Sequence, residues 1–302
     1  MLVASNLRKE YSSVVAVDDV SLTVRPGQVF GLIGPNGAGK TTTIRMILNI
    51  ITPDRGLVTF QGRPFDESTR NLVGYLPEER GLYRKNKLLN TILYFASLKG
   101  IPVAEARRRA YEWLKKFDLL NAYDRKVEEL SKGNQQKVQF IIAVLHEPQL
   151  VILDEPFSGL DPVNQLLLSE FFLELKQQGK AIIFSTHVMD QAERLCESIC
   201  LINKGKVVLD GALTEVKKRF GMNSIHLEFD GDGSFLTELP QVKKAVAYQN
   251  SAELELVDGV ATRAILQACS ERINIRKFEV LEPSLNAIFL NAVGANVVKE
   301  EK

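Results

Sequence analysis

The sequence has no long hydrophobic run. Spanning a bilayer as a helix takes about 20 consecutive apolar residues, whereas the longest apolar stretches here, such as 140–145 and 151–153, are far shorter. The first nine residues also lack the apolar core of a signal peptide. We therefore expect that the chain does not cross a membrane itself and that any membrane role depends on a partner.

Cysteine is scarce, and so is any excess of charge of one sign. Three cysteines in 302 residues, Cys196, Cys200 and Cys269, do not suggest a disulfide framework, and we expect them to be buried. The 38 basic and 37 acidic residues give a formal net charge of +1. This balance gives no electrostatic reason to expect nucleic acid or an anionic membrane as the main partner.

What the sequence does contain is an alternation of short apolar runs and helical patterns, which predicts an α/β architecture. The continuous apolar runs Val29–Ile33, 150–153 and 181–184 are typical of strands buried on both faces of a largely parallel sheet. The segment 17–24 alternates more regularly and predicts a peripheral antiparallel sheet.

Two regions depart from this alternation. Residues 86–100 and 103–118 have apolar positions at helical spacing with no strand between them, which predicts an inserted helical subdomain over about 78–145. Beyond residue 220 the pattern predicts a small α+β domain. Its three strand-like series and one helical pattern lie at 224–229, 253–257, 275–280 and 261–270.

A glycine-rich segment follows the first buried strand and opens a helical pattern, which is the context that a phosphate-binding loop requires. It consists of Gly34, Pro35, Asn36, Gly37, Ala38, Gly39, Lys40 and Thr41. The glycines let successive backbone N–H groups point at the β- and γ-phosphates of a nucleotide, and the positive end of the helix adds attraction. Lys40 supplies a charge to the phosphate oxygens, the Thr41 hydroxyl is placed for Mg²⁺, and Thr42 is a candidate for the α-phosphate. The alternative, a coincidental glycine-rich turn, fits the lysine and the threonine poorly.

Two other predicted strands end in candidate chemical groups. The run 150–153 ends in Asp154 and Glu155, of which Asp154 is a candidate to hold Mg²⁺ through water and Glu155 to polarise the attacking water. His187 follows the run 181–184, at the strand end where α/β sheets place ligand chemistry. We expect His187 to contact the γ-phosphate; the alternative is a structural histidine.

In this order, these elements resemble the ATPase cassette of ATP-binding-cassette (ABC) transporters. The diagnostic segment is 130–136, LSKGNQQ, which looks like the family signature and precedes a helical pattern at 134–145. The resemblance implies that Ser131 and Gly133 contact the γ-phosphate of ATP held by a second subunit. It also implies that Tyr11 stacks on adenine, a surface tyrosine being the alternative. A further implied loop crosses the dimer interface with Ser158, Gly159, Leu160 and Asp161.

The chain departs from the family pattern at two motifs. Glu78 stands in the segment 74–78, GYLPE, where glutamine is usual. An ionised glutamate only accepts hydrogen bonds, whereas glutamine also donates, but Glu78 remains a candidate contact for Mg²⁺. In the signature, Lys132 replaces a common glycine and Asn134 a common glutamine.

These departures, together with the segment 77–83, resemble an exporter branch that includes sodium-extrusion and drug-efflux ATP-binding subunits. The segment 282–289 resembles the C-terminal domain of the same branch. We therefore expect a P-loop nucleotide-binding domain of ABC ATPase type at 1–220, with an antiparallel β subdomain and the helical insertion. A small α+β accessory domain is expected at 221–302, either regulatory, dimer-stabilising or a passive extension.

The resemblance implies a transport motor that binds ATP and Mg²⁺ and hydrolyses ATP. Its expected partners are a second copy of itself or a homologous ATPase subunit, and an integral membrane permease that docks near residues 81–90. The chain would then lie in the cytoplasm, on the inner face of the cell membrane through the permease. The alternative is a soluble ABC-type ATPase that acts on nucleic acid or ribosomes. Long coiled-coil insertions, zinc motifs and a second cassette, which are usual in such proteins, are missing here.

Overall fold

The computed structural model describes residues 1–79, 81–220, 224–257, 259–281 and 283–300. It divides into two compact units, Met1–Gly211 and Ala212–Lys302. Each unit is described by itself below. Within the described residues, no helix is long and apolar enough to span a membrane.

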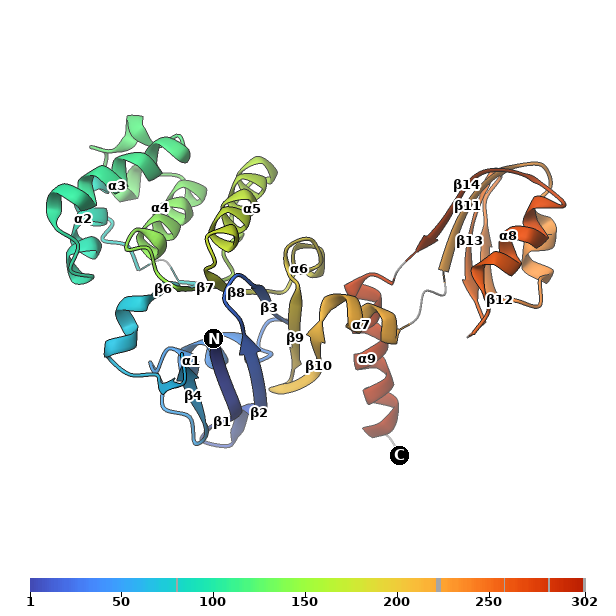
Figure 1. The fold of residues 1–302 in the computed structure, drawn as a ribbon, viewed down its shortest axis with the longest axis horizontal. Helices are drawn as coiled ribbons and strands as arrows, with labels where there is room; N and C mark the ends of the chain where they lie inside the picture. Colours follow the sequence, from blue (N-terminus) through green and yellow to red (C-terminus); the bar gives the residue numbers. More distant parts are fainter. Residues whose placement is uncertain (80, 221–223, 258, 282, 301–302) are drawn as a thin grey trace. The chain divides into compact units, whose positions relative to one another are not determined.

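A six-stranded sheet forms the centre of the first unit (Figure 1). Its strands, in spatial order, are β10 (Lys206–Ala212), β9 (Ser198–Asn203), β3 (Val29–Ile33), β8 (Ala181–Thr186), β7 (Leu150–Asp154) and β6 (Val73–Leu76). The pairs from β9 to β6 are parallel. Every residue of β3, β7 and β8 is buried, which explains their continuous apolar sequences and confirms the predicted parallel sheet.

The register of the parallel strands brings three chain segments to one edge of this sheet. Ile33 is opposite Thr186, and Asp154 is opposite Ser185. The residues that follow β3, β7 and β8 therefore lie side by side at the carboxyl ends of the strands, where α/β sheets place their ligand sites.

A four-stranded antiparallel sheet completes the β-structure of the first unit and confirms the predicted peripheral sheet. Its strands, in spatial order, are β2 (Val14–Val24), β1 (Leu2–Tyr11), β4 (Arg55–Phe60) and β5 (Arg63–Pro64). Helix α1 (Lys40–Ile47) contacts β1 and β2 of this sheet and β7 of the central one. One hydrophobic core joins the two sheets, because Leu7, Leu32 and Ile44 belong to the same buried cluster.

Helices fill the segment between β6 and β7, with no strand among its described residues, as predicted. They are α2 (Leu88–Leu98), α3 (Val103–Lys116), the 3₁₀ turns η2 (Leu120–Ala122) and η3 (Val127–Glu129), and α4 (Lys132–Val144). Figure 1 shows α2, α3 and α4 grouped on the opposite side of the central strands from the antiparallel sheet. A further 3₁₀ turn and two helices complete the unit: η1 (Ser68–Leu72), α5 (Pro162–Gln177) and α6 (Met189–Leu195).

One glycine and one serine determine the position and the start of α4 in this unit. Gly74 of β6 packs against the backbone of α4, and a Cβ there would lie 1.9 Å from the Ala143 carbonyl oxygen. Helix α4 begins at Lys132, two residues before the predicted helical pattern, because Ser131 caps it. The Ser131 Oγ accepts the Asn134 N–H at 3.2 Å.

The second unit is an α+β domain built on its own hydrophobic core, which includes Ile225, Leu254 and Ile265. Its sheet has the order β12-β13-β11-β14. The elements in chain order are α7 (Leu213–Arg219), β11 (Ser224–Asp230), η4 (Ser234–Glu238), β12 (Val242–Ala247), β13 (Ser251–Leu256), α8 (Thr262–Ser270), β14 (Asn274–Leu281) and α9 (Leu285–Glu300). The unit begins before the predicted boundary at residue 220, because α7 belongs with it. Residues 221–223 and Glu282, on which parts of the sequence analysis fall, lie outside the described residues.

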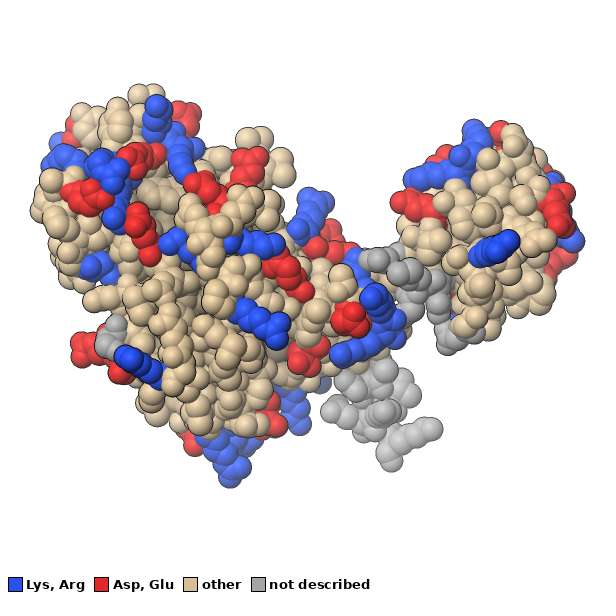
Figure 2. Space-filling view, viewed as in Figure 1, with Lys and Arg blue, Asp and Glu red and all other residues tan. Residues whose placement is uncertain are grey.

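Basic and acidic side chains are intermixed on the faces of both units that Figure 2 shows. All three cysteines are free and buried, as expected. Burial raises the pKa of the Cys196 and Cys200 thiols.

Candidate nucleotide-binding site

The loop between β3 and α1 has glycine where a side chain would collide with backbone. A Cβ on Gly34 would lie 2.1 Å from the Ile202 carbonyl oxygen, and one on Gly39 would lie 2.5 Å from the Ala16 carbonyl oxygen. Gly39 also has φ +106°, which L-residues rarely adopt. The sequence therefore folds here into a tight curl, and residues 36–42 of this curl and of the helix that follows line a pocket.

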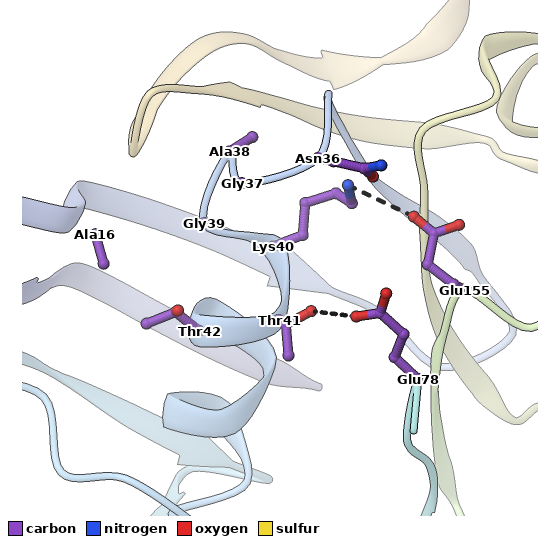
Figure 3. Close-up of a pocket in the computed structure, with 10 residues that line it drawn as sticks. All are labelled: Ala16, Asn36, Gly37, Ala38, Gly39, Lys40, Thr41, Thr42, Glu78 and Glu155. Atoms are coloured by element: carbon purple, nitrogen blue, oxygen red, sulfur yellow. Dashed lines mark hydrogen bonds and ion pairs between the residues drawn. The ribbon is translucent and has the colours of Figure 1, made fainter. Parts of the chain in front are cut away.

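That pocket lies over the N-terminus of α1 (Figure 3). The first N–H groups of a helix have no acceptor within the helix, and no side chain of the described chain caps α1. An anion is the natural partner for such a helix end. The residues that line the pocket are Ala16, Asn36, Gly37, Ala38, Gly39, Lys40, Thr41, Thr42, Glu78 and Glu155.

Lys40 is held inside the loop by its own neighbours. Its ammonium group donates to the carbonyl oxygens of Gly34 at 2.8 Å and Pro35 at 3.1 Å. The Nζ atom also lies 3.5 Å from Glu155 Oε1, and the Lys40 side chain is only 6% exposed. The positive charge is thus buried, paired and directed at the pocket.

Asp154, at the end of β7, is fully buried with one carboxylate oxygen satisfied and one not. Its Oδ1 accepts a hydrogen bond from the Ser185 hydroxyl of β8, while Oδ2 has no hydrogen-bond partner among the described residues. Burial raises the pKa of this carboxyl, and the nearby Glu78 and Glu155 carboxylates add to the rise, whereas the hydrogen bond from Ser185 and the nearby Thr41 hydroxyl oppose it. An unpaired buried carboxylate oxygen is costly, so the arrangement fits a cation ligand at this position.

Glu155 follows directly in a conformation that is unusual for a residue with a side chain. Its φ is +48°, which costs on the order of 1–3 kcal/mol and is typical of functional sites. The Ser185 Oγ accepts the Glu155 N–H at 2.9 Å, which helps to hold this turn. Both carboxylate oxygens of Glu155 lie 3.1 Å from His187 Nδ1, so the structure brings Lys40, Glu155 and His187 together.

Glu78 reaches the same pocket from the loop after β6. Its Oε2 accepts a hydrogen bond from the Thr41 hydroxyl at 3.4 Å. Figure 3 shows Glu78 and Glu155 pointing toward Thr41 and Lys40, respectively. Thr41, Asp154 and Glu78, the three predicted metal contacts, are therefore neighbours.

The predicted signature residues lie on a separate part of the unit and do not line this pocket. Gly133 packs against the loop after β7, since a Cβ on it would lie 3.4 Å from the Gly159 carbonyl oxygen and 3.5 Å from Leu160 Cδ2. Gln136 Nε2 donates to the Pro156 carbonyl oxygen at 3.1 Å. The signature segment and the predicted dimer loop thus form one surface.

Within that surface, exposure differs among the predicted interface residues. Ser131, Ser158, Gly159 and Asp161 are exposed, whereas the Leu160 side chain is 8% exposed and packs inside its own chain. Asp161 caps α5 by accepting the Asn164 N–H at 3.0 Å. Tyr11, at the end of β1, is 47% exposed and does not line the pocket.

Two residues of the site, Ser185 and Ala16, were not among the predicted ones. Ser185 links Asp154 to the Glu155 backbone, and Ala16 of β2 forms one wall of the pocket. A signal for Ser185 was its position in the polar end of a buried strand, directly before Thr186 and His187. Ala16 gave no signal, because a small apolar residue in a strand is not distinctive.

A second pocket, here called the apolar groove, lies between the segment 73–82, α2 and α4. Its lining residues are Val73, Tyr75, Pro77, Gly81, Leu82, Phe95, Leu98, Lys99, Gln139, Ile142, Ala143 and His146. The Val73 carbonyl oxygen accepts a hydrogen bond from Lys99 Nζ at 3.2 Å and lies 3.1 Å from His146 Nε2. Burial lowers the pKa of His146 to about 4, and nearby cations, Lys99 foremost, add to this.

Comparison with known proteins decides the family. A family model described as ABC transporter matches residues 17–158, and one described as the C-terminal domain of DrrA1-3-like ATP-binding proteins matches residues 211–293. The uncharacterized ABC transporter ATP-binding protein YhaQ of Bacillus subtilis (strain 168) is 44% identical over 98% of this chain and 99% of its own length. The chain belongs to the ABC transporter ATP-binding proteins.

Other relatives support the assignment of this chain to the ABC family. The linearmycin resistance ATP-binding protein LnrL of the same organism is 31% identical over 97% of this chain and 98% of its own length. The dimeric bacterial ABC transporter cassette MJ0796 has a TM-score of 0.66 and 25% identity, covering 70% of this chain and 99% of that cassette. The predicted fold class and family are confirmed.

The chain is accordingly an ATP-binding and ATP-hydrolysing subunit that powers a transporter. Among the solved relatives, CbiO1 of Clostridium perfringens is part of the ABC transporter complex CbiONQ, and the MJ0796 cassette is dimeric. The C-terminal match supports the predicted resemblance to the exporter branch. None of the relatives named here supports the alternative of a nucleic-acid machine.

Proposed function

We propose that two copies of this subunit close around two molecules of MgATP and drive export through a membrane permease. The observation that carries the proposal is the series of contacts from Lys40, in the pocket above the glycine loop, to Glu155 and from Glu155 to His187. Glu155 and His187 follow two neighbouring parallel strands, β7 and β8, and Lys40 opens the helix after β3, so the sheet positions all three segments.

The loop and the first turn of α1 would hold the triphosphate. Residues 36–42 line the pocket and include the uncapped N-terminus of α1, and Lys40 supplies the positive charge for the β- and γ-phosphate oxygens. Because Lys40 now pairs with Glu155 and two carbonyl oxygens, its ammonium group must exchange these partners for phosphate. The exchange keeps the buried charge compensated throughout.

The residues present fit a magnesium ion. Asp154 Oδ2 is buried without a partner, and the Thr41 hydroxyl and the Glu78 carboxylate lie nearby, an all-oxygen donor set that Mg²⁺ prefers. When bound, Mg²⁺ would neutralise charge on the phosphates. Asp154, Thr41 and Glu78 are the residues that would hold it, in part through water.

Glu155 is the group that would orient and polarise the attacking water. Its carboxylate is 11% exposed and stands at the pocket mouth, and its backbone is held by Ser185. His187 would fix the Glu155 carboxylate by its contact through Nδ1 and reach the γ-phosphate with the rest of its exposed ring. Phosphoryl transfer needs mainly such positioning and charge stabilisation.

A second copy would complete the site. The exposed Ser131 and the adjoining N-terminus of α4 form a second anion-binding helix end, and they would cover the γ-phosphate from the opposite side. Gly133, Ser158, Gly159 and Asp161 would form the rest of this dimer surface, and Leu160, predicted with them, packs beneath it. Tyr11 would stack on the adenine of its own subunit. The partner copy is this chain itself or a homologous ATPase subunit.

The apolar groove would receive a cytoplasmic helix of the permease. Leu82, Phe95 and Leu98 offer it an apolar wall, and Leu98 is 61% exposed and Tyr83 beside the groove is 51% exposed. The groove overlaps the predicted docking segment 81–90. The subunit would then sit in the cytoplasm on the inner face of the membrane, and the name of the relative LnrL, a resistance protein, supports export as the direction.

Magnesium-dependent hydrolysis of ATP by the purified chain tests this proposal. We expect turnover by the wild type and at least a hundredfold loss in Lys40→Ala, because a preorganised charge at the phosphates is removed. Lys87→Ala is the control, since Lys87 is an exposed lysine paired only with Asp124 in the described structure. Equal turnover by Lys40→Ala and wild type would contradict the proposed site.

A further inference from the structure

Glu78 places a third carboxylate at the phosphate pocket. Its Oε2 lies 3.4 Å from the Thr41 hydroxyl, and the side chain lines the pocket together with Glu155. Asp154 lies behind them, close enough for the charge of Glu78 to raise its pKa. The loop after β6 therefore adds a negative charge at the position that a terminal phosphate would approach.

The charges that line the pocket do not balance. Among the described residues of the lining, Lys40 is the one that is basic and Glu78 and Glu155 are the two that are acidic, so these side chains carry a net charge of −1. Lys40 is moreover shared with Glu155 at 3.5 Å. A metal-free triphosphate, with about four negative charges, would meet net repulsion from these side chains, which the backbone of the glycine loop and the helix end of α1 oppose.

The described protein also offers no complete metal site of its own. Within the described residues, no three histidine, cysteine, aspartate or glutamate side chains are grouped as a metal ion would require. Asp154 nevertheless presents an unpaired, fully buried carboxylate oxygen. A divalent cation would therefore take its remaining oxygen ligands from the nucleotide. The Asp154 and Glu78 carboxylates would then bind the complex of cation and nucleotide better than the cation alone or the nucleotide alone.

We infer that Glu78 makes nucleotide uptake dependent on a divalent cation, so that this subunit accepts ATP as its magnesium complex and rejects metal-free ATP. The inference rests on the proposed function of the pocket and assigns to Glu78 the selection between these two forms. Replacing Glu78 by glutamine removes one negative charge and keeps the size of the side chain.

Equilibrium binding of ATP, measured by calorimetry in excess Mg²⁺ and in EDTA, tests the inference without relying on hydrolysis. We expect wild-type protein to bind metal-free ATP at least tenfold more weakly than MgATP. In E78Q, affinity for metal-free ATP should rise about tenfold, the effect of removing one nearby charge, while affinity for MgATP stays equal or falls. E79Q is the matched control: Glu79 is the next residue, is exposed and does not line the pocket, and it should behave as wild type.

The outcomes separate this inference from the proposed function. Equal binding of metal-free ATP by wild type and E78Q, with MgATP bound by both, would overturn the role of Glu78 and leave the proposed function standing. The same rise in E79Q would assign the effect to net charge and also overturn it. Failure of the wild type to bind MgATP would overturn the proposed function itself, and the inference with it.

Discussion

Pro77 and Glu78 are consecutive residues that line two different pockets. Pro77 lies in the apolar groove beside α2 and α4, whereas Glu78 lies in the phosphate pocket and accepts a hydrogen bond from Thr41. One peptide unit thus joins the surface proposed for the permease to the site proposed for ATP. A shift of the loop after β6 cannot move one of these side chains and leave the other in place.

The docking surface can be tested with two exposed side chains. Leu98→Glu places a charge on the rim of the apolar groove, so we expect at least a tenfold loss of permease that co-purifies from membranes, because the charge would be desolvated on docking. Tyr111→Glu is the matched control. Tyr111, on α3, is 60% exposed, about as much as Leu98 at 61%, but it does not line the groove. Equal retention of the permease by both variants would place the docking surface elsewhere.

Alanine substitutions at two glycines of the loop should separate the steric cost to stability from the cost of an unfavourable backbone conformation. Gly34→Ala meets the Ile202 carbonyl oxygen at 2.1 Å, and we expect it to lower the free energy of unfolding by about 3–5 kcal/mol and to weaken ATP binding. Gly37→Ala has φ +76° but nothing within 4 Å of the new Cβ, so it should cost only about 1–2 kcal/mol. Urea unfolding of both variants measures the difference. An equal loss of stability in the two variants would mean that the backbone around Gly34 moves to accommodate the new Cβ without cost.

Ser131 has a structural and a proposed functional role that substitutions can separate. Ser131→Ala removes the cap of α4 and should cost about 1 kcal/mol of stability, whereas Ser131→Asp keeps a capping oxygen and should stay within about 0.5 kcal/mol of wild type. The aspartate would nevertheless face a phosphate of the second copy, so we expect its ATPase rate to fall at least tenfold. Full activity in Ser131→Asp would show that Ser131 acts only as a cap.

The buried His146 should make the free energy of unfolding depend on pH. Burial lowers its pKa to about 4 in the folded chain, compared with about 6.5 in an unfolded chain. As the pH falls from 6.5 toward 4, the unfolded chain takes up a proton that the folded chain does not, so the free energy of unfolding falls; above this window the group has no effect. We expect this residue to account for about 1–2 kcal/mol of the loss between about pH 7 and about pH 5.

The variant His146→Gln keeps a donor for the Val73 carbonyl oxygen and removes the titration. Urea unfolding at the two pH values should therefore show a smaller loss of stability in the variant. The same loss in both proteins would assign the acid sensitivity to other groups.

The grouping of Lys40, Thr41, Asp154 and Glu155 could be predicted from the sequence because each pair is close in the chain to the end of a buried strand. Lys40 and Thr41 open the helix after the loop that follows β3, Asp154 ends β7 and Glu155 follows it, and parallel strands bring such ends together. The apolar groove could not be predicted, since it needs segments from β6, α2 and α4 whose packing depends on contacts such as that of Gly74 with the Ala143 carbonyl oxygen.

Three other features were not predicted. Ser185 stands in the polar end of a buried strand, but its hydrogen bonds to Asp154 and to the Glu155 N–H depend on the pairing of β7 with β8. The start of α4 depended on a cap at Ser131 rather than on apolar periodicity, and the second unit includes α7 because of contacts that the composition of the segment does not show.

The account depends most on closure of two copies around ATP. Glu155→Gln should bind MgATP, fail to turn it over and therefore accumulate as an ATP-bound dimer, because the water-polarising carboxylate is lost while Lys40 and the glycine loop remain. Size-exclusion chromatography with light scattering, with and without MgATP, measures this directly. We predict a shift from monomer to dimer on addition of MgATP; a variant that binds MgATP and stays monomeric would contradict the account.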